Sequence, residues 1–162
     1  MIISFLAFVS IAESCKKEDT TPQLEAVNAT VSGDMTYLQK DFKVLTATPS
    51  GAPQTALITM EGTGTVTLIG KITMKSTFEF DFAAGKGSNF NSVYADASGN
   101  TFTMGGTSQT ATGKQWAVYV TETVKSGTGR FMKITTTSGG ISGATMKNDG
   151  TGTGHIDWVM TF

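Results

Sequence analysis

Few side chains of this sequence could do acid–base chemistry, and the first candidates are His155 and Asp157. His155 is the only histidine, and Asp157 follows two residues later, so both would lie on one face of an extended strand. Such a pair could orient an imidazole as a general base. No nucleophile stands out among the many serine and threonine residues, so we expect a solvated polar pair on an outer face.

Two carboxylates and one arginine are the other candidates. Glu79 and Asp81 alternate with phenylalanines, which indicates the polar side of an ordinary strand rather than a carboxylate pair or a calcium site. Arg130 is the only arginine, and we expect it to be structural, in an ion pair or in carbonyl contacts at one end of the fold. The sequence therefore indicates no catalytic residue, no metal site and no cofactor.

The only cysteine, Cys15, separates an apolar run from a charged one. Residues 1–14 fit the apolar core of a secretory signal peptide. Their end, Ala12-Glu13-Ser14, together with Cys15 resembles a bacterial lipobox, in which the cysteine is lipidated. A signal peptide cut by ordinary signal peptidase, or a buried amino-terminal strand, is the alternative. We expect a lipoprotein of the cell envelope, held in the outer membrane through Cys15.

The residues after Cys15 are polar and charged, as in a flexible tether. Among them, Lys17-Glu18-Asp19 resembles the surface-export signal of lipoproteins from the Bacteroidetes. Lys and Arg together number 12 and Asp and Glu 13, so no basic excess exists to neutralise phosphates. We therefore expect no nucleic-acid partner. A single cysteine also excludes an intrachain disulfide.

The clearest strand is KITMKSTFEFDF, residues 71–82, in which apolar and polar side chains alternate. This period of two places the apolar residues on one sheet face and the polar residues on the other. We expect Phe80 to be inside, and Lys75 and Glu79 to be exposed.

The segments 116–120 and 156–162 alternate in the same way, which predicts that Trp116 and Trp158 are buried. About eight or nine such strands, separated by turn residues, indicate an all-β fold in which one antiparallel meander closes into a single barrel. A β-sandwich is the alternative. Shorter strands are expected at 39–48, 56–61, 64–69, 90–96, 100–107 and 132–138.

The domain organisation follows from these patterns. Residues 1–14 are expected to be the signal peptide, and residues 15–35 the lipidated cysteine with its tether or a first strand. The barrel domain is expected to occupy residues 36–162.

Gly-Thr-Gly triplets occur at 62–64, 127–129 and within 150–154. Strands rather than helices follow them, so bulges or tight barrel bends are favoured over a phosphate-binding loop. The run EGTGTVTLIGKITMKSTFEFD, the turn SGTGRF at 126–131 and the closing GTGTGHIDWVMTF resemble the bacterial allene oxide cyclase barrel-like family. This resemblance covers residues 57–162 and implies a calycin-like barrel. The plant enzyme's catalytic residues match no positions here, so its activity is not implied.

Bulky apolar side chains could either pack a core or line a lumen for a small apolar ligand. Packing is the default, so we place a non-enzymatic interaction or structural module first. A carrier of a small apolar ligand is second, and an isomerase or cyclase related to allene oxide cyclase is third. The candidate lumen residues are Met74, Phe78, Phe80, Phe102, Met104, Trp116 and Trp158, and Met60 and Met132 belong to the same soft apolar set.

Overall fold

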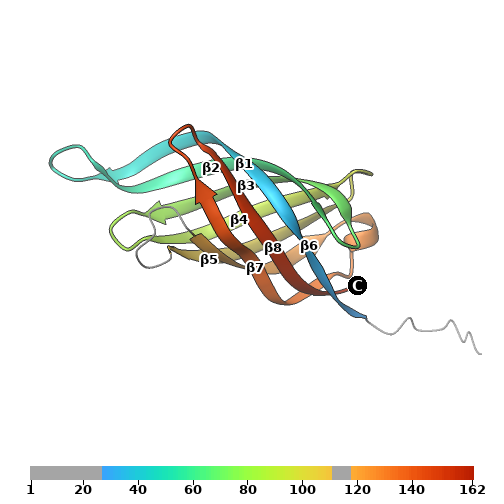
Figure 1. The fold of residues 1–162 in the computed structure, drawn as a ribbon. Coiled ribbons are helices and arrows are strands. Elements are labelled where there is room, and N and C mark those ends of the chain that lie inside the picture. The colour runs from blue at the N-terminus through green and yellow to red at the C-terminus, as the bar shows by residue number, and fades with distance from the viewer. Residues whose placement is uncertain (1–26, 111–117) are drawn as a thin grey trace, which may run out of the picture.

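The chain forms a closed antiparallel β-barrel of eight strands, described here for residues 27–110 and 118–162 of a computed structural model (Figure 1). Each strand pairs with the next along the chain, and β1 pairs with β8 to close the barrel. The all-β barrel predicted from the alternating pattern is therefore confirmed. The strands are β1 (Asn28–Ala47), β2 (Pro53–Val66), β3 (Gly70–Asp81), β4 (Lys86–Asp96), β5 (Thr101–Thr110), β6 (Val118–Gly127), β7 (Thr135–Met146) and β8 (Thr151–Thr161).

The barrel has two different ends. One end carries the turns that follow β1, β3 and β7, and the long β1–β2 hairpin projects beyond the other strands there (Figure 1). We call this the mouth end. The opposite end carries the start of β1, the end of β8 and the 3-10 turn η1 (Gly129–Phe131). The part of the chain that the structure describes contains no helix long and apolar enough to cross a bilayer.

Strand β1 begins at Asn28, within the stretch 15–35 that the sequence left open between tether and first strand. Strand β2 is continuous, so the separate strands predicted at 56–61 and 64–69 are wrong. The register with β1 runs unbroken through Gly62 and Gly64, and a Cβ at Gly64 would lie 2.4 Å from the backbone oxygen of Asp34. These glycines therefore allow close approach of β1 and form no bulge.

The strand predicted at 132–138 is also misplaced, because β7 covers Thr135–Met146. The residues before it form η1 and the turn that follows it. As a result Met132, which we grouped with the buried methionines, is 71% exposed.

The apolar faces of the strands share one interior. On β3, Met74 and Phe80 are buried and Lys75 is exposed, whereas Glu79 is half-buried rather than exposed as predicted. On β8, Trp158 and the apolar residues two positions before and after it are fully buried. The predicted inner faces of both strands are thus confirmed, but Phe162, predicted to continue the inner face of β8, lies beyond its end and is 41% exposed. Trp116 lies outside the described residues.

An aromatic cluster fills the interior at the end opposite the mouth. Tyr94 stacks on Phe102 with ring centroids 5.1 Å apart, and Trp158 packs edge-on against Tyr94 at 5.0 Å. Phe131 of η1 meets Phe102 at 5.0 Å. All four side chains are almost fully buried. This end of the barrel is therefore plugged by packed rings, and we call it the closed end.

Arg130 fastens η1 to the closed end. Its Nε donates to Asp96 Oδ2 at 2.7 Å, and its Nη2 donates to the backbone oxygen of Ile69 at 3.0 Å. Asp96 also accepts hydrogen bonds from Asn100, whose side chain is the main cause that lowers the pKa of Asp96 below its ordinary value. The structure thus places Arg130 in the ion pair and the carbonyl contact that the sequence predicted.

Arg130→Met should lower the melting temperature by about 5 °C, because it removes a charge-assisted hydrogen bond to a carboxylate and frees η1. The measurement is thermal unfolding followed by circular dichroism. Lys75→Met, at an exposed position on β3, is the control and should melt within about 1 °C of wild type. Equal melting of the two variants would contradict a structural role for Arg130.

Candidate ligand-binding site

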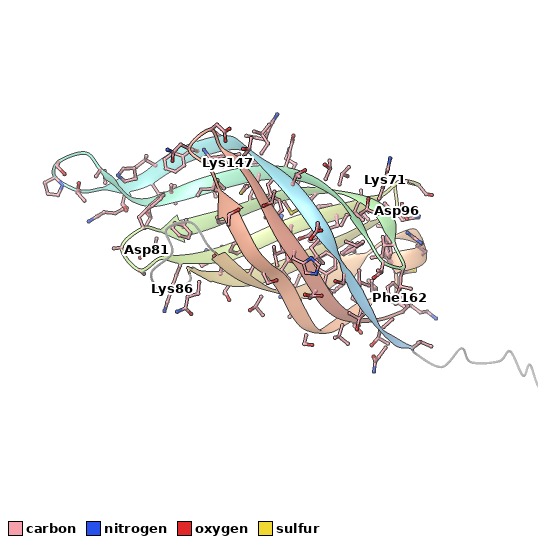
Figure 2. All side chains as sticks on the ribbon, viewed as in Figure 1. Lys71, Asp81, Lys86, Asp96, Lys147 and Phe162 are labelled. Atoms are coloured by element: carbon pink, nitrogen blue, oxygen red, sulfur yellow. The ribbon has the colours of Figure 1, made fainter. Side chains whose placement is uncertain are left out.

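The half of the barrel nearer the mouth is not filled by side chains. It contains a cavity of about 600 Å³ between the aromatic cluster and the mouth end. Figure 2 shows Asp81, Lys86 and Lys147 at the mouth end, and Lys71, Asp96 and Phe162 toward the closed end. Every strand except β8 contributes to the cavity wall. The lining includes aromatic, apolar, hydroxyl and carboxyl side chains, among them Tyr37, Phe42, Met74, Ser76, Phe78, Phe80, Phe82, Phe90, Ser92, Ser108, Glu122 and Ala144.

Phenylalanines form most of the wall on the side of β3 and β4. Phe78 and Phe90 stack with centroids 4.4 Å apart, and Phe80 packs edge-on against Phe82 at 5.1 Å. Phe42, from the part of β1 that reaches the mouth, lies 6.0 Å from Phe82. This wall presents apolar ring faces and edges to whatever enters the cavity.

A carboxyl group lies on the floor of the cavity, where it meets the aromatic cluster. Glu122 of β6 is 1% exposed. Tyr94 donates its hydroxyl hydrogen to Glu122, with distances of 2.9 Å to Oε1 and 3.1 Å to Oε2. Trp158 donates from Nε1 to Oε2 at 3.2 Å. Two rings of the packed half therefore hold the carboxyl group at the base of the open half.

Burial raises the pKa of Glu122 to about 7, because water is excluded from the ionised form. The hydrogen bonds from Tyr94 and Trp158 act in the opposite direction but are the smaller effect. Burial, followed by the nearby Glu122, also raises the pKa of Tyr94 well above its ordinary value. Near neutral pH the floor therefore holds a neutral phenol beside a carboxyl group that is partly protonated and partly ionised.

Hydroxyl groups complete the polar part of the lumen. Ser76 and Ser92 hydrogen-bond to each other at 2.8 Å, across paired positions of β3 and β4. Tyr37 Oη and Ser108 Oγ are buried and have no hydrogen-bond partner among the described residues. Buried polar atoms without a partner are costly, so both hydroxyls retain unused hydrogen-bonding capacity in the cavity wall.

The structure divides the predicted lumen residues into two groups. Met74, Phe78 and Phe80 line the cavity. Phe102, Met104 and Trp158 are fully buried but do not line it, because they belong to the packed half. Trp116 lies outside the described residues.

Glu122 was missed by the sequence reasoning, although a signal for it exists. It shares its parity with Val118, Val120 and Val124, so it is a carboxylate on the apolar face of a strand. A charged residue in that position is buried only at a cost, which marks it as a candidate functional group. The same pattern in β1 places Tyr37 on the inner face with Met35.

The predicted polar pair at His155 is part of a larger cluster on the outer surface. His155 Nδ1 is 2.6 Å from Asp34 Oδ1, and Nε2 is 2.9 Å from Ser32 Oγ and 3.5 Å from Asp157 Oδ2. The hydrogen bond to Asp34 is the main cause that raises the pKa of His155.

This cluster contains a serine, a histidine and a carboxylate in hydrogen-bonding order, but it lacks other parts of a nucleophilic site. Its residues lie where β1 is paired with both β8 and β2. The backbone N–H groups there are engaged in the hydrogen bonds of the sheet, so they do not form an oxyanion hole. Among the described residues, no group of three or more His, Cys, Asp or Glu side chains is arranged to hold a metal ion. The cluster therefore serves as a polar clasp between β1 and β8.

The lumen and its floor are the part of the molecule best suited to binding. The chain matches no family model, no curated protein and no solved structure.

Proposed function

We propose that the barrel binds a small, largely apolar molecule in its lumen. The observation that carries this proposal is the cavity of about 600 Å³ with unpartnered hydroxyls in its wall. Binding sites for small molecules usually have about 300–1,000 Å³, a mainly apolar lining and a few placed polar groups. The phenylalanine wall and the Glu122 floor have this composition.

The half-open lumen changes the order of the functions considered from the sequence. An interaction or structural module was placed first because packing was the default for the apolar residues. A packed interior would have left a ligand no space, whereas the cavity leaves space beside three of the predicted lumen residues, Met74, Phe78 and Phe80. A carrier or sensor of an apolar ligand therefore comes first.

One observation favours a second candidate, an isomerase or cyclase as in the barrel family that the sequence resembles. Glu122 has a pKa of about 7, near the value that suits a general acid or base at neutral pH. A bound molecule would have to place a reacting atom beside this carboxyl group.

The main test introduces bulk into the mouth without removing any core contact. Ala144 of β7 is partly buried and lines the cavity. Ala144→Phe should weaken binding of an apolar fluorescent probe by about tenfold or more, because the added ring occupies the space of the ligand. The measurement is probe fluorescence during titration with the protein.

Thr121→Phe is the matched control, because Thr121 is exposed on the neighbouring strand β6 and adds the same ring to the outer surface. It should bind the probe as wild type does. If wild type fails to bind, or if both variants bind equally well, the lumen is not the binding site.

We also propose that the protein is an envelope lipoprotein anchored through Cys15, with the barrel outside the bilayer. The apolar run before Cys15 and the polar residues after it support this proposal. Metabolic labelling with a fatty-acid analogue should mark wild type and lose the signal completely in Cys15→Ala. Equal labelling of both proteins would rule out this anchor.

A further inference from the structure

We propose that the ligand of the lumen is a hydrophobic amine, whose protonated ammonium group pairs with Glu122 while its apolar body lies against the phenylalanine wall. This ligand class rests on the proposed function, because it takes the lumen to be a binding site. The charge balance and the hydrogen-bonding groups inside the cavity support it.

The carboxyl group on the cavity floor has no counter-charge beside it among the residues that the structure describes. The side chains that hydrogen-bond to Glu122 are those of Tyr94, Trp158 and Ser92, and all three are neutral. Among the described cavity residues, Lys147 is the only basic one, and it lies exposed at the mouth beside Asp149. Ionised Glu122 would therefore gain most from a cation that the ligand brings with it.

The titratable groups that face Glu122 are tyrosines rather than cations. Burial, and then the charge of Glu122, raises the pKa of both Tyr37 on β1 and Tyr94 on β4, so both phenols stay neutral. The polar residues that line the cavity on β3, β4 and β5 are Ser76, Ser92 and Ser108, which carry no charge. Nothing on the described wall competes with a ligand cation for the carboxylate.

The hydroxyl oxygens of the lumen also suit an ammonium group. An ammonium has three N–H donors and no acceptor, so it needs several oxygens around it. Glu122 supplies a charged acceptor, and the free hydroxyls of Tyr37 and Ser108 are buried and can accept as well. A hydrogen bond between charged groups is roughly twice as strong as one between neutral groups.

Other head groups fit the floor less well. A carboxylate would place a second negative charge beside Glu122, which raises the cost of ionising either group. An alcohol can hydrogen-bond to the floor but leaves the charge of Glu122 unpaired. The lumen should therefore discriminate between amphiphiles by head group when their alkyl chains are the same.

The test compares decylamine, decanol and decanoate binding to the full chain, measured by displacement of the fluorescent probe. At about pH 8.5 the amine is protonated and Glu122 is ionised. We expect wild type to bind decylamine about tenfold more tightly than decanol, and decanoate most weakly. At about pH 5 the preference for the amine should fall to near one, because Glu122 is then protonated.

Two variants assign the preference to the floor. Glu122→Gln should lose the preference for decylamine over decanol at both pH values. Tyr37→Phe removes one unpartnered hydroxyl, so it should weaken the binding of decylamine several-fold more than the binding of decanol.

The outcomes separate this inference from the proposed function. Equal binding of decylamine and decanol by wild type, or a preference that survives Glu122→Gln, would overturn the amine ligand and leave a binding lumen. If wild type binds the probe and none of the three compounds displaces it, the amine ligand is again overturned. Failure to bind the probe as well would overturn the proposed function.

Discussion

Glu122→Gln should stabilise the barrel by about 3 kcal/mol at pH values well above 7, and should change its stability little near pH 5. Burial raises the pKa of Glu122 from 4.5 to about 7, so the folded protein holds this proton more tightly than the unfolded chain does. The contribution of Glu122 is therefore fully present below pH 4.5 and is lost as pH rises through about 7. Glutamine resembles the protonated acid and does not ionise.

The measurement is urea unfolding of both proteins at about pH 5 and about pH 8.5, with the buried Trp158 as a fluorescent probe. His155 also has a raised pKa, so its contribution to the free energy of unfolding also decreases as pH rises. Comparing the variant with wild type at each pH removes this shared effect. Glu61→Gln, at an exposed carboxylate, is the control and should stay within about 0.5 kcal/mol. A wild type more stable than Glu122→Gln at about pH 8.5 would contradict the raised pKa.

Trp158→Ala should lower the free energy of unfolding by about 3–5 kcal/mol, the usual cost of truncating a buried large aromatic side chain. Trp158 is fully buried, packs edge-on against Tyr94 and Phe102, and donates a hydrogen bond to Glu122. Its loss would leave a void under the cavity floor and remove one of the hydrogen-bond donors that hold the carboxyl group. Urea unfolding followed by circular dichroism measures the effect.

Two variants check that this effect arises from packing in the closed end. Trp158→Phe keeps a ring but removes the indole N–H, so its loss should be smaller than that of alanine. Phe162→Ala truncates a 41% exposed aromatic residue beyond the end of β8, so its loss should be clearly smaller than that of Trp158→Ala. Similar losses for Trp158→Ala and Phe162→Ala would show that the aromatic cluster does not support the barrel.

The barrel could be predicted because the strands have a strict inner and outer alternation. In β3 the alternating phenylalanines specified one face, and a sheet with a single apolar face avoids exposed edges by closing. The limits of β2 could not be predicted in the same way. Gly62 and Gly64 indicate a bend as readily as close approach of two backbones, and the choice depends on the neighbouring strand β1.

The site was harder to predict than the fold. Alternation shows that Met74 and Phe102 both face inward, but one lines the cavity and the other belongs to the packed half. That difference depends on which side chains from distant strands meet at each level of the barrel. Glu122 could have been found from its parity, whereas its partners Tyr94 and Trp158 come from β4 and β8 and are brought together only by closure.

The pairing of β1 with β8 has a consequence for how the barrel forms. Every other pairing joins neighbouring strands and can form as a local hairpin, but this one brings Asn28 beside Thr161. The entropy cost of closing a loop grows with its length, so this seam is the least local step of folding. Until it closes, β1 and β8 are open edges on which a second chain could add strands. The hydrogen bonds of His155 with Asp34 and Ser32 join β8 to β1 across this seam. They therefore stabilise the pairing that removes both open edges and so protects the chain from aggregation.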